Sequence, residues 1–309
     1  MMTGHPLSRR DFLRLAGVAL GSAILNPQCV LGFQDKMILR KIPRSGEALP
    51  AVGIGSYLTF DVSDTSDLEH VREVMRLFTD LGGRLVDSSP MYGLAESVIG
   101  DVTADLGINQ ELFFATKVWT SGRDSGIQQA QQSMSRMRTK KLDLLQVHNL
   151  LDVDTHLKWL HEWKQAGKIR YVGVTHYDAG AFLALEKYVT SKQVDFVQLN
   201  YSMAEREAED RMLPAAAASG TAVIVNRPFA QASLFDRVKG RPLPEWTSEF
   251  DASSWAQFFL KYILANPAVT CVIPATRSPK HLEDNMGAGM GKVPDQKTRQ
   301  RMLSLLNTF

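Results

Sequence analysis

Residues 68–93, LEHVREVMRLFTDLGGRLVDSSPMYG, carry the pattern that decides the fold, an amphipathic segment followed by a short apolar run. Apolar side chains recur in the first segment with the 3.6-residue period of a helix, at Val71, Val74, Met75, Phe78 and Leu81. Gly82 and Gly83 follow, as is common just past the C-terminus of a helix. The next run, Arg84–Ser88, predicts a strand, so the stretch is one helix followed by one strand.

The same alternation of short apolar runs and longer amphipathic segments recurs along the chain. The candidate strands are Val52–Tyr57, Arg84–Ser88, Leu112–Lys117, Leu142–His148, Tyr171–Val174, Phe196–Leu199, Ala222–Val225 and Cys271–Ile273. Strands that alternate with helices predict a parallel sheet, and eight such units predict a closed (β/α)8 TIM barrel. An open, doubly wound sheet is the alternative, but no Gly-x-Gly-x-x-Gly motif follows any candidate strand.

Two segments fall outside the repeating units. Ile38–Leu49, with Ser45-Gly46 at its centre, predicts a hairpin before the first barrel strand. The gap after the seventh strand is longer and contains Arg227–Trp246, whose Pro, Gly and Phe content predicts an extended loop. We therefore expect one barrel domain over residues 31–309.

Composition excludes several classes of protein. The 309 residues carry 35 Lys and Arg against 33 Asp and Glu, a net charge of +2, so nothing indicates a nucleic-acid partner. Two cysteines, Cys29 and Cys271, cannot form a disulfide framework, and Cys271 is expected to be buried in a strand. No cluster of His or Cys at ligand spacing indicates a metal, and no apolar run is long enough for a stable membrane span.

The first 30 residues have the layout of an export signal. Ser8–Arg14 reads SRRDFLR, and the moderately apolar stretch Leu15–Leu25 follows. The paired Arg9 and Arg10 before Phe-Leu resemble the twin-arginine motif, which implies export of the folded protein to the periplasm by the twin-arginine machinery. The alternative is a surface helix that happens to contain Arg-Arg, in a protein that stays in the cytoplasm. A lipid anchor attached to Cys29 is a further alternative.

Ionisable side chains stand where three neighbouring candidate strands end, and a fourth follows shortly after. Asp87 ends the second strand and Tyr92 lies five residues later, while Lys117 and His148 end the third and fourth strands. In a barrel, the carboxyl ends of the strands carry the chemistry. Taken singly, Asp87 would be a helix cap, Lys117 the partner of an acidic neighbour and His148 a core histidine. Together they indicate an acid–base site.

The chemistry of such a quartet is specific. A tyrosine with a pKa near 10 is a poor proton donor at neutral pH, and an adjacent lysine lowers that pKa by favouring the phenolate. Asp87 would pair with Lys117 and keep it charged, and neutral His148 would orient a substrate oxygen. Such groups protonate a carbonyl oxygen as hydride reaches the carbon. Proteins have no hydride donor of their own, so a nicotinamide cofactor is implied.

These residues resemble the signatures of the aldo-keto reductases. Residues 85–96, LVDSSPMYGLAE, and residues 116–119, TKVW, are similar to two motifs of that family, and His148 stands at the position of its catalytic histidine. The resemblance implies that Tyr92 is the general acid and base, that Lys117 and Asp87 tune it, and that Trp119 lines the substrate pocket. A core tryptophan is the alternative for Trp119.

The resemblance extends to the parts of the family that bind the cofactor. It implies that Thr175, His176 and Gln198 hold the nicotinamide carboxamide. Residues 273–277 and 281–285 are similar to the adenosine-end motif, in a layout like that of the shaker-channel subunits of the family. That similarity implies contacts from Thr276, Arg277, His281, Glu283, Asp284 and Asn285, and it favours NADP over NAD.

Two departures from the family pattern bear on function. His176 replaces the usual Asn, and Asn226-Arg227 stands where the family commonly has an aromatic residue and Ser. Arg227 is a candidate clamp for the pyrophosphate, with a solvated loop arginine as the alternative. We expect an exported, NADP-dependent oxidoreductase acting on a small carbonyl or alcohol. The alternative is a non-catalytic, nicotinamide-binding sensory module, and an unknown redox partner would recycle a cofactor held outside the cytoplasm.

Overall fold

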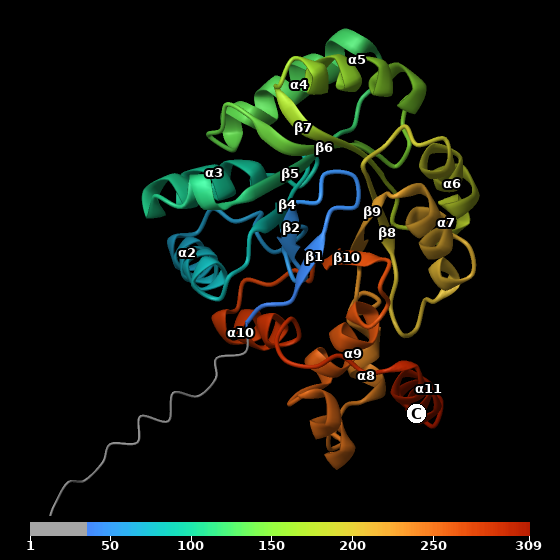
Figure 1. Cartoon of the computed structure of the whole chain (residues 1–309). Coiled ribbons are helices and arrows are strands. Elements are labelled where there is room, and N and C mark those ends of the chain that lie inside the picture. Colours follow the sequence, from blue (N-terminus) through green and yellow to red (C-terminus); the bar gives the residue numbers. More distant parts are fainter. Residues whose placement is uncertain (1–35) are drawn as a thin grey trace, which may run out of the picture. The chain divides into compact units, whose positions relative to one another are not determined.

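Eight parallel strands form the central sheet of the computed structural model, which describes residues 36–309 (Figure 1). Their order in the sheet follows their order in the sequence. The strands are β3 (Ile54–Gly55), β4 (Leu85–Asp87), β5 (Phe113–Val118), β6 (Leu142–His148), β7 (Ile169–Thr175), β8 (Phe196–Asn200), β9 (Ala222–Asn226) and β10 (Val269–Val272). All eight correspond to candidate strands of the sequence. The expected export segment, residues 1–30 with Cys29, lies outside the described residues.

The first and last strands meet and close the sheet. Val52 bridges to Val272 and Gly55 to Ala275, both in parallel, and the Gly53 N–H donates to the Val272 carbonyl at 2.8 Å. A Cβ on Gly53 would lie 2.7 Å from the Leu85 carbonyl oxygen, so only glycine permits this approach. These contacts confirm the closed (β/α)8 barrel and exclude the open sheet.

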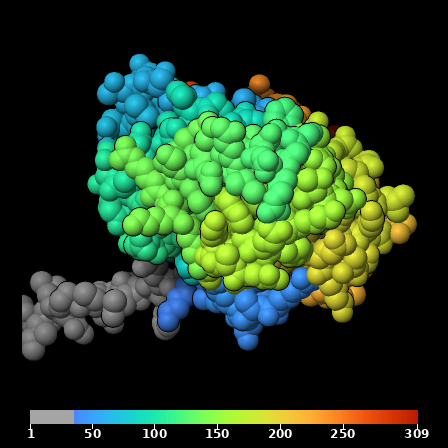
Figure 2. All heavy atoms as spheres, turned by 90° about the horizontal axis from the view of Figure 1, so that it is seen from above, coloured from blue at the N-terminus to red at the C-terminus, as the bar shows by residue number. Residues whose placement is uncertain are grey.

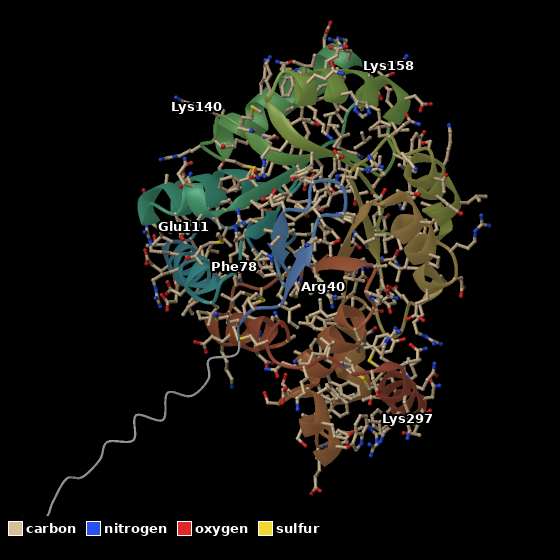
Figure 3. The ribbon with its side chains drawn as sticks, viewed as in Figure 1. Arg40, Phe78, Glu111, Lys140, Lys158 and Lys297 are labelled. Atoms are coloured by element: carbon tan, nitrogen blue, oxygen red, sulfur yellow. The ribbon has the colours of Figure 1, made fainter. Side chains whose placement is uncertain are left out.

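Helices cover the outside of the barrel, and all but the last two connect successive strands. They are α2 (Thr65–Asp80), α3 (Ala95–Leu106), α4 (Arg123–Arg136), α5 (Val153–Gln165), α6 (Phe182–Thr190), α7 (Met212–Ser219), α9 (Trp255–Leu264), α10 (Pro279–Gly287) and α11 (Gln296–Leu306). Asp64 begins α2 by accepting the Ser66 N–H at 2.8 Å, which places its start before the first apolar position. Phe78 on its inner face is fully buried, whereas Lys140 and Lys158 point outward (Figure 3). None of the helices within residues 36–309 is long and apolar enough to cross a membrane.

The predicted hairpin covers the end of the barrel where the strands begin. Strands β1 (Leu39–Lys41) and β2 (Ala48–Pro50) pair in antiparallel fashion, and Figure 2 shows this segment in dark blue along the lower edge of the barrel. Ile42 and Leu49 are fully buried against the side chains that fill the barrel interior. Cys271 belongs to the same interior cluster and is fully buried, as expected. The opposite end, where the strands finish and the following loops begin, is the mouth of the barrel.

The expected extended loop Arg227–Trp246 is only partly irregular, because part of it forms helical turns. It contains helix α8 (Ser233–Arg237), and a 3-10 helix (Glu245–Phe250) begins within it. The ring of Phe235 lies 4.9 Å from that of Phe229 and 5.7 Å from that of Phe259 on α9 (centroid distances). The aromatic residues that interrupt a polar loop pattern are therefore packing residues, and burying them against α9 favours the helical turns.

We expect Gly53→Ala to destabilise the barrel by about 1–3 kcal/mol, because its methyl group would press on a backbone carbonyl that cannot rotate away. Urea unfolding followed by circular dichroism measures the change. Gly180→Ala is the matched control, since its nearest neighbour is the flexible carboxylate of Asp178. Equal stabilities of the two variants would show that the close approach is not required.

Candidate active site

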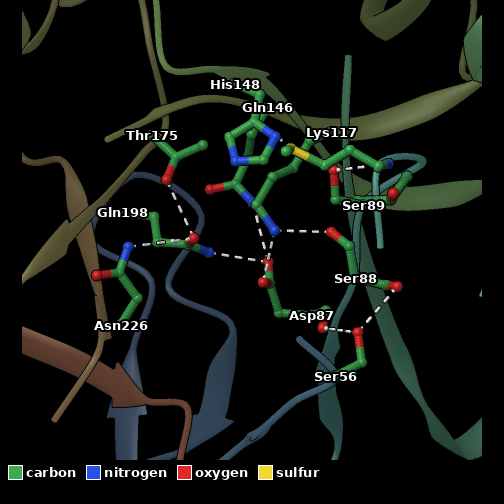
Figure 4. A network of polar contacts seen from close by, with 12 residues as sticks. Ser56, Asp87, Ser88, Ser89, Lys117, Gln146, His148, Thr175, Gln198 and Asn226 are labelled. Carbon is green, nitrogen blue, oxygen red and sulfur yellow. Dashed lines mark hydrogen bonds and ion pairs between the residues drawn. The ribbon is translucent and has the colours of Figure 1, made fainter. Parts of the chain in front are cut away.

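Polar side chains from five neighbouring strands meet inside the mouth of the barrel (Figure 4). The parallel register aligns the strand ends, pairing Lys117 with Gln146, His148 with Thr175, and Thr175 with Gln198. Asp87 at the end of β4 completes the set. Because all these strands run in one direction, residues far apart in the sequence finish at the same edge.

Asp87 and Lys117 form a buried ion pair at the centre of this network. The Lys117 Nζ atom donates to the Asp87 Oδ2 atom at 2.6 Å and to the Ser88 carbonyl at 2.7 Å, with side-chain exposures of 0% for Lys117 and 4% for Asp87. The other carboxylate oxygen accepts from the amides of Gln146 at 3.2 Å and Gln198 at 2.8 Å. Each charge therefore has an opposite charge and hydrogen-bond partners within reach, as a buried ion pair needs when water is excluded.

Burial and neighbouring charges set the pKa values of Lys117 and Tyr92. Burial is the largest single influence on Lys117 and disfavours its ammonium, but Asp87 and Tyr92 together outweigh burial and hold the pKa of Lys117 above its usual value. The Lys117 Nζ atom lies 5.0 Å from the centroid of the Tyr92 ring. Its charge lowers the pKa of Tyr92, as expected, yet burial is the larger influence and the net pKa of Tyr92 is raised. The expectation that Lys117 brings the pKa of Tyr92 below its usual value is therefore wrong.

His148 stands beside Tyr92 as a neutral imidazole. Burial, followed by the positive charge of Lys117, lowers the pKa of His148 to about 3. Its Nδ1 atom lies 3.2 Å from the Ser89 hydroxyl. When Ser89 donates to Nδ1, the ring proton is on Nε2 and can be donated to a substrate oxygen. The rings of His148 and Tyr92 are 6.0 Å apart in an edge-on arrangement.

Trp119 borders the same group of side chains and is not a core residue. It is 42% exposed, and its ring centroid lies 6.3 Å from that of His148. The Gln129 side chain accepts its backbone N–H at 2.6 Å and holds the start of the loop. The structure therefore favours the pocket interpretation of Trp119 over the core alternative.

The candidate nicotinamide residues lie next to the quartet but are linked to one another. The Thr175 hydroxyl donates to the Gln198 carbonyl oxygen at 3.0 Å, while the Gln198 amide donates to Asp87. His176 is half-buried and accepts the Asp178 N–H at 3.1 Å, and burial lowers its pKa. Thr175 and Gln198 thus belong to the catalytic network as well as to the expected cofactor site.

Arg227 is fixed at the mouth rather than free in solvent. Its guanidinium donates to the Tyr177 carbonyl at 3.0 Å, lies 3.7 Å from the Glu205 carboxylate, and stands 5.8 Å above the Tyr177 ring. Its side chain is 25% exposed, so these contacts hold a partly buried guanidinium at the start of the loop after β9. A guanidinium held in this way is suited to a phosphate oxygen.

The candidate adenosine-end residues gather around the start of α10. Ser278 caps the helix, Thr276 is buried, and Arg277 forms an ion pair of 3.0 Å with Asp67 on α2. His281 and Glu283 are exposed, Asn285 is buried, and Asp284 accepts from the Gln257 amide at 2.9 Å. These residues form a group of their own, joined to α2 by Arg277 and to α9 by Asp284.

Buried polar atoms without partners show that the mouth fits a polar ligand. Nine buried side-chain atoms within residues 36–309 lack a hydrogen-bond partner, and five of them lie in the last three residues of β6, β8 or β9 or directly after one of these strands. They are the side-chain oxygens of Gln146, Asn149, Asn200 and Asn226, and the Nε atom of Arg227. Four acceptors suit an amide donor such as a carboxamide, and one cationic donor suits a phosphate, so the residues fit a nicotinamide dinucleotide.

Several of these residues escape sequence reasoning. Gln146 is two positions before His148, and the period of two in a strand would have placed it on the same inward face. Asn200 ends β8 two positions after Gln198, so the same period of two applies to it, whereas Ser89 and Glu205 lie in loops and carry no comparable signal. Within the described part of the chain, no group of three or more His, Cys, Asp or Glu side chains is arranged to hold a metal.

Curated relatives match most of the chain. A methylglyoxal reductase of Escherichia coli is 27% identical over 262 residues, which cover 82% of this chain and 89% of the relative. An L-galactose dehydrogenase of Arabidopsis thaliana is 26% identical, covering 82% and 88% of the respective chains.

Solved structures share the fold at lower identity. An aldo-keto reductase of Bacillus halodurans superposes with a TM-score of 0.70 at 23% identity, covering 87% of this chain and 96% of that one. An aldo/keto reductase of Klebsiella pneumoniae, solved with NADP and acetate, gives a TM-score of 0.71 at 23% identity, covering 84% and 93%. The model of the aldo/keto reductase family matches residues 51–301. With the barrel, the site at its mouth and a match over most of its length, the chain belongs to the aldo/keto reductase family of oxidoreductases.

Proposed function

We propose that this protein reduces an aldehyde or ketone with NADPH and oxidises the corresponding alcohol in the reverse direction. The observation that carries the proposal is the buried Asp87–Lys117 pair with Tyr92 and a neutral His148 beside it. Family membership supports the reaction class, as do the names of relatives that are reductases or dehydrogenases.

Each residue of the quartet has one step in the proposed reaction. His148 donates a hydrogen bond to the carbonyl oxygen and orients it. The reduced nicotinamide, when bound, supplies the hydride that the carbonyl carbon accepts. Tyr92 gives its proton to the oxygen, forming the alcohol and leaving a phenolate. Lys117, kept protonated by Asp87, stabilises that phenolate until a proton returns from solvent.

The proposed cofactor is NADP. Two solved structures with this fold, both from Klebsiella pneumoniae, contain NADP or NADPH. In this chain Thr276 and Arg277 stand at the start of α10, where a helix N-terminus favours an anion, and we assign them to the 2′-phosphate. The shaker-subunit-like layout of residues 273–285 belongs to the same proposal, with His281, Asp284 and Asn285 near the adenine.

A non-catalytic, nicotinamide-binding module is the second candidate. It is favoured by two departures from the family pattern, Asn226 at the end of β9 in place of an aromatic residue and His176 in place of an asparagine. Tight NADPH binding without turnover of any carbonyl compound would select this candidate.

Tyr92→Phe should lower kcat for carbonyl reduction by about 10²–10⁴-fold, the usual contribution of a general acid. The aromatic ring remains and only the hydroxyl is lost, so NADPH binding should be retained. Loss of NADPH absorbance measures turnover, and fluorescence quenching measures binding. Unchanged turnover in the variant would rule out Tyr92 as the acid.

The pH profile of reduction tests the protonation states. The reaction needs a protonated Tyr92, and burial raises the pKa of that phenol above its usual value. We expect kcat/KM to be flat from about pH 6 to 9 and to fall only above about pH 10, where the phenol ionises. His148, with a pKa of about 3, stays neutral over that range. An inflection near pH 6.5 would contradict the assignment of His148.

Lys117→Met should destabilise the fold by about 3–5 kcal/mol, because it leaves the buried Asp87 carboxylate without its cation. The double variant Asp87→Asn/Lys117→Met should recover much of that loss, since the new amide can accept from Gln198 and donate to the Ser88 carbonyl. Urea unfolding of the three proteins measures both effects. Additive losses in the double variant would mean that the two charges are not energetically coupled.

We also propose that the protein is exported to the periplasm by the twin-arginine route. The sequence SRRDFLR and the following apolar stretch support this proposal. Export after folding would carry the cofactor out bound, where an unknown redox partner would have to recycle it.

Replacing Arg9 and Arg10 by Lys should retain the protein in the cytoplasm of a bacterium that has the twin-arginine machinery. Arg44→Lys, a change beyond the signal, is the control and should leave export intact. Separation of periplasmic and cytoplasmic fractions, with detection by antibody, measures the distribution. Wild-type protein confined to the cytoplasm would contradict export.

A further inference from the structure

Basic side chains gather on the end of the barrel opposite the mouth, which we call the basic end. It comprises residues 36–50, with the hairpin, and the connections that lead into strands β4 to β10, which are residues 81–84, 107–112, 137–141, 166–168, 191–195, 220–221 and 265–268. These segments carry ten Lys and Arg against three Asp and Glu, whereas the rest of residues 36–309 carries 22 against 28. A chain with a net charge of only +2 thus places a strong positive charge on one face.

Most of this charge is not neutralised by neighbouring side chains. Asp195 is already paired with Lys164 at 2.7 Å, and Glu47 is paired with Arg170. Five exposed lysines of the basic end have no carboxylate partner within residues 36–309, namely Lys41, Lys140, Lys141, Lys168 and Lys192. Figure 3 looks onto this end, with Arg40 near its centre and Lys140 at its margin. Long lysine side chains without partners can reach charges that are not fixed in one geometry.

An exposed apolar side chain lies among these cations. Leu39 on β1 is 60% exposed and precedes Arg40 and Lys41 in the sequence. The three residues line a cavity of about 600 Å³ that opens on the basic end, together with Pro43 and Pro267. Binding to a lipid surface combines these two features, because apolar groups enter the headgroup region while cations meet the phosphates.

The chain enters the described barrel at the same end. Lys36 is exposed, and the Ile38 N–H donates to the Gly289 carbonyl at 2.7 Å. A Cβ on Gly82, in the connection before β4, would lie 3.7 Å from the Met37 side chain. The residues that precede Lys36 in the sequence contain the apolar stretch Leu15–Leu25. Attachment to a membrane through that stretch would bring the basic end to the lipid.

We propose that the basic end docks on an anionic phospholipid bilayer, with Leu39 in the headgroup region and the mouth of the barrel turned toward the solvent. The proposal goes beyond the proposed reaction and does not depend on it. The charge alone would also suit an acidic protein. The exposed leucine, and the spread of the free lysines over four separate segments, favour a lipid surface, which offers phosphates at every point of contact.

Sedimentation with lipid vesicles tests the proposal on the full chain. Vesicles of phosphatidylcholine are compared with vesicles that contain about 30% phosphatidylglycerol, and binding to the anionic vesicles should be stronger by about tenfold or more at about 0.1 M salt. The difference should disappear at about 1 M salt, where the Debye length falls to about 3 Å. Equal binding to both kinds of vesicle at low salt would overturn the proposal. Binding to neither would overturn it in favour of an acidic protein.

Matched charge variants locate the binding, because residues 1–35 are the same in all of them. Lys41→Gln/Lys140→Gln should weaken partitioning onto anionic vesicles by about tenfold or more, at about fivefold for each lysine near the surface. Lys158→Gln/Lys239→Gln removes the same charge from the outer face of α5 and from the loop after β9, and should change partitioning by less than about threefold. Equal losses in the two double variants would contradict docking through the basic end.

A pair of leucine variants tests the apolar contact. Leu39→Ala should weaken binding to anionic vesicles by about threefold or more, because less apolar surface leaves water. Leu183→Ala is the control, since Leu183 is 71% exposed near the start of α6, on the mouth side of the barrel. The same affinity for both variants would show that Leu39 does not enter the lipid and would overturn its place in the proposal.

Discussion

The ion pair between Asp87 and Lys117 is the constraint on which the site depends. Two opposite charges inside a barrel are tolerated only when each satisfies the other and the remaining hydrogen bonds are made. Here those bonds come from Ser88, Gln146 and Gln198, so four strands are tied to one carboxylate and one ammonium. A well-packed apolar pair would hold a barrel together at least as well. The retention of the charges is therefore better explained by chemistry than by stability.

Burial divides the protonation states of the catalytic groups. It raises the pKa of the Tyr92 phenol and lowers the pKa of the His148 imidazole, so both groups are neutral at ordinary pH. Only Lys117 keeps its charge, because Asp87 is within hydrogen-bonding distance. One cation beside two neutral donors is an arrangement in which proton donation leaves a negative oxygen next to a positive nitrogen. Desolvation thus keeps Tyr92 and His148 neutral, while the neighbouring carboxylate keeps Lys117 charged.

The sequence predicted the barrel and the core of the site because both follow from strand periodicity. Apolar runs of the correct spacing marked the eight strands, and Asp87, Lys117 and His148 were found because each ends such a run. Gln146 was within reach of the same argument but was missed. The position of Ser89 depends on loop conformation, which a pattern of single residues does not encode. The direction of the Tyr92 pKa was missed for a related reason, since it depends on how deeply the ring is buried.

Closure of the barrel also sets the order in which the chain can fold. The bridge from Val52 to Val272 joins positions about 220 residues apart, and the ion pair of Arg277 with Asp67 spans nearly as far. During synthesis, the open edge of β3 can have no native partner on that side until β10 has left the ribosome. Contacts of such high sequence separation slow folding and prolong the exposure of unpaired strand edges. A nascent chain of this protein therefore carries the edge of β3 unpaired through most of its translation, and the short length of that strand, two residues, limits the surface open to wrong pairing.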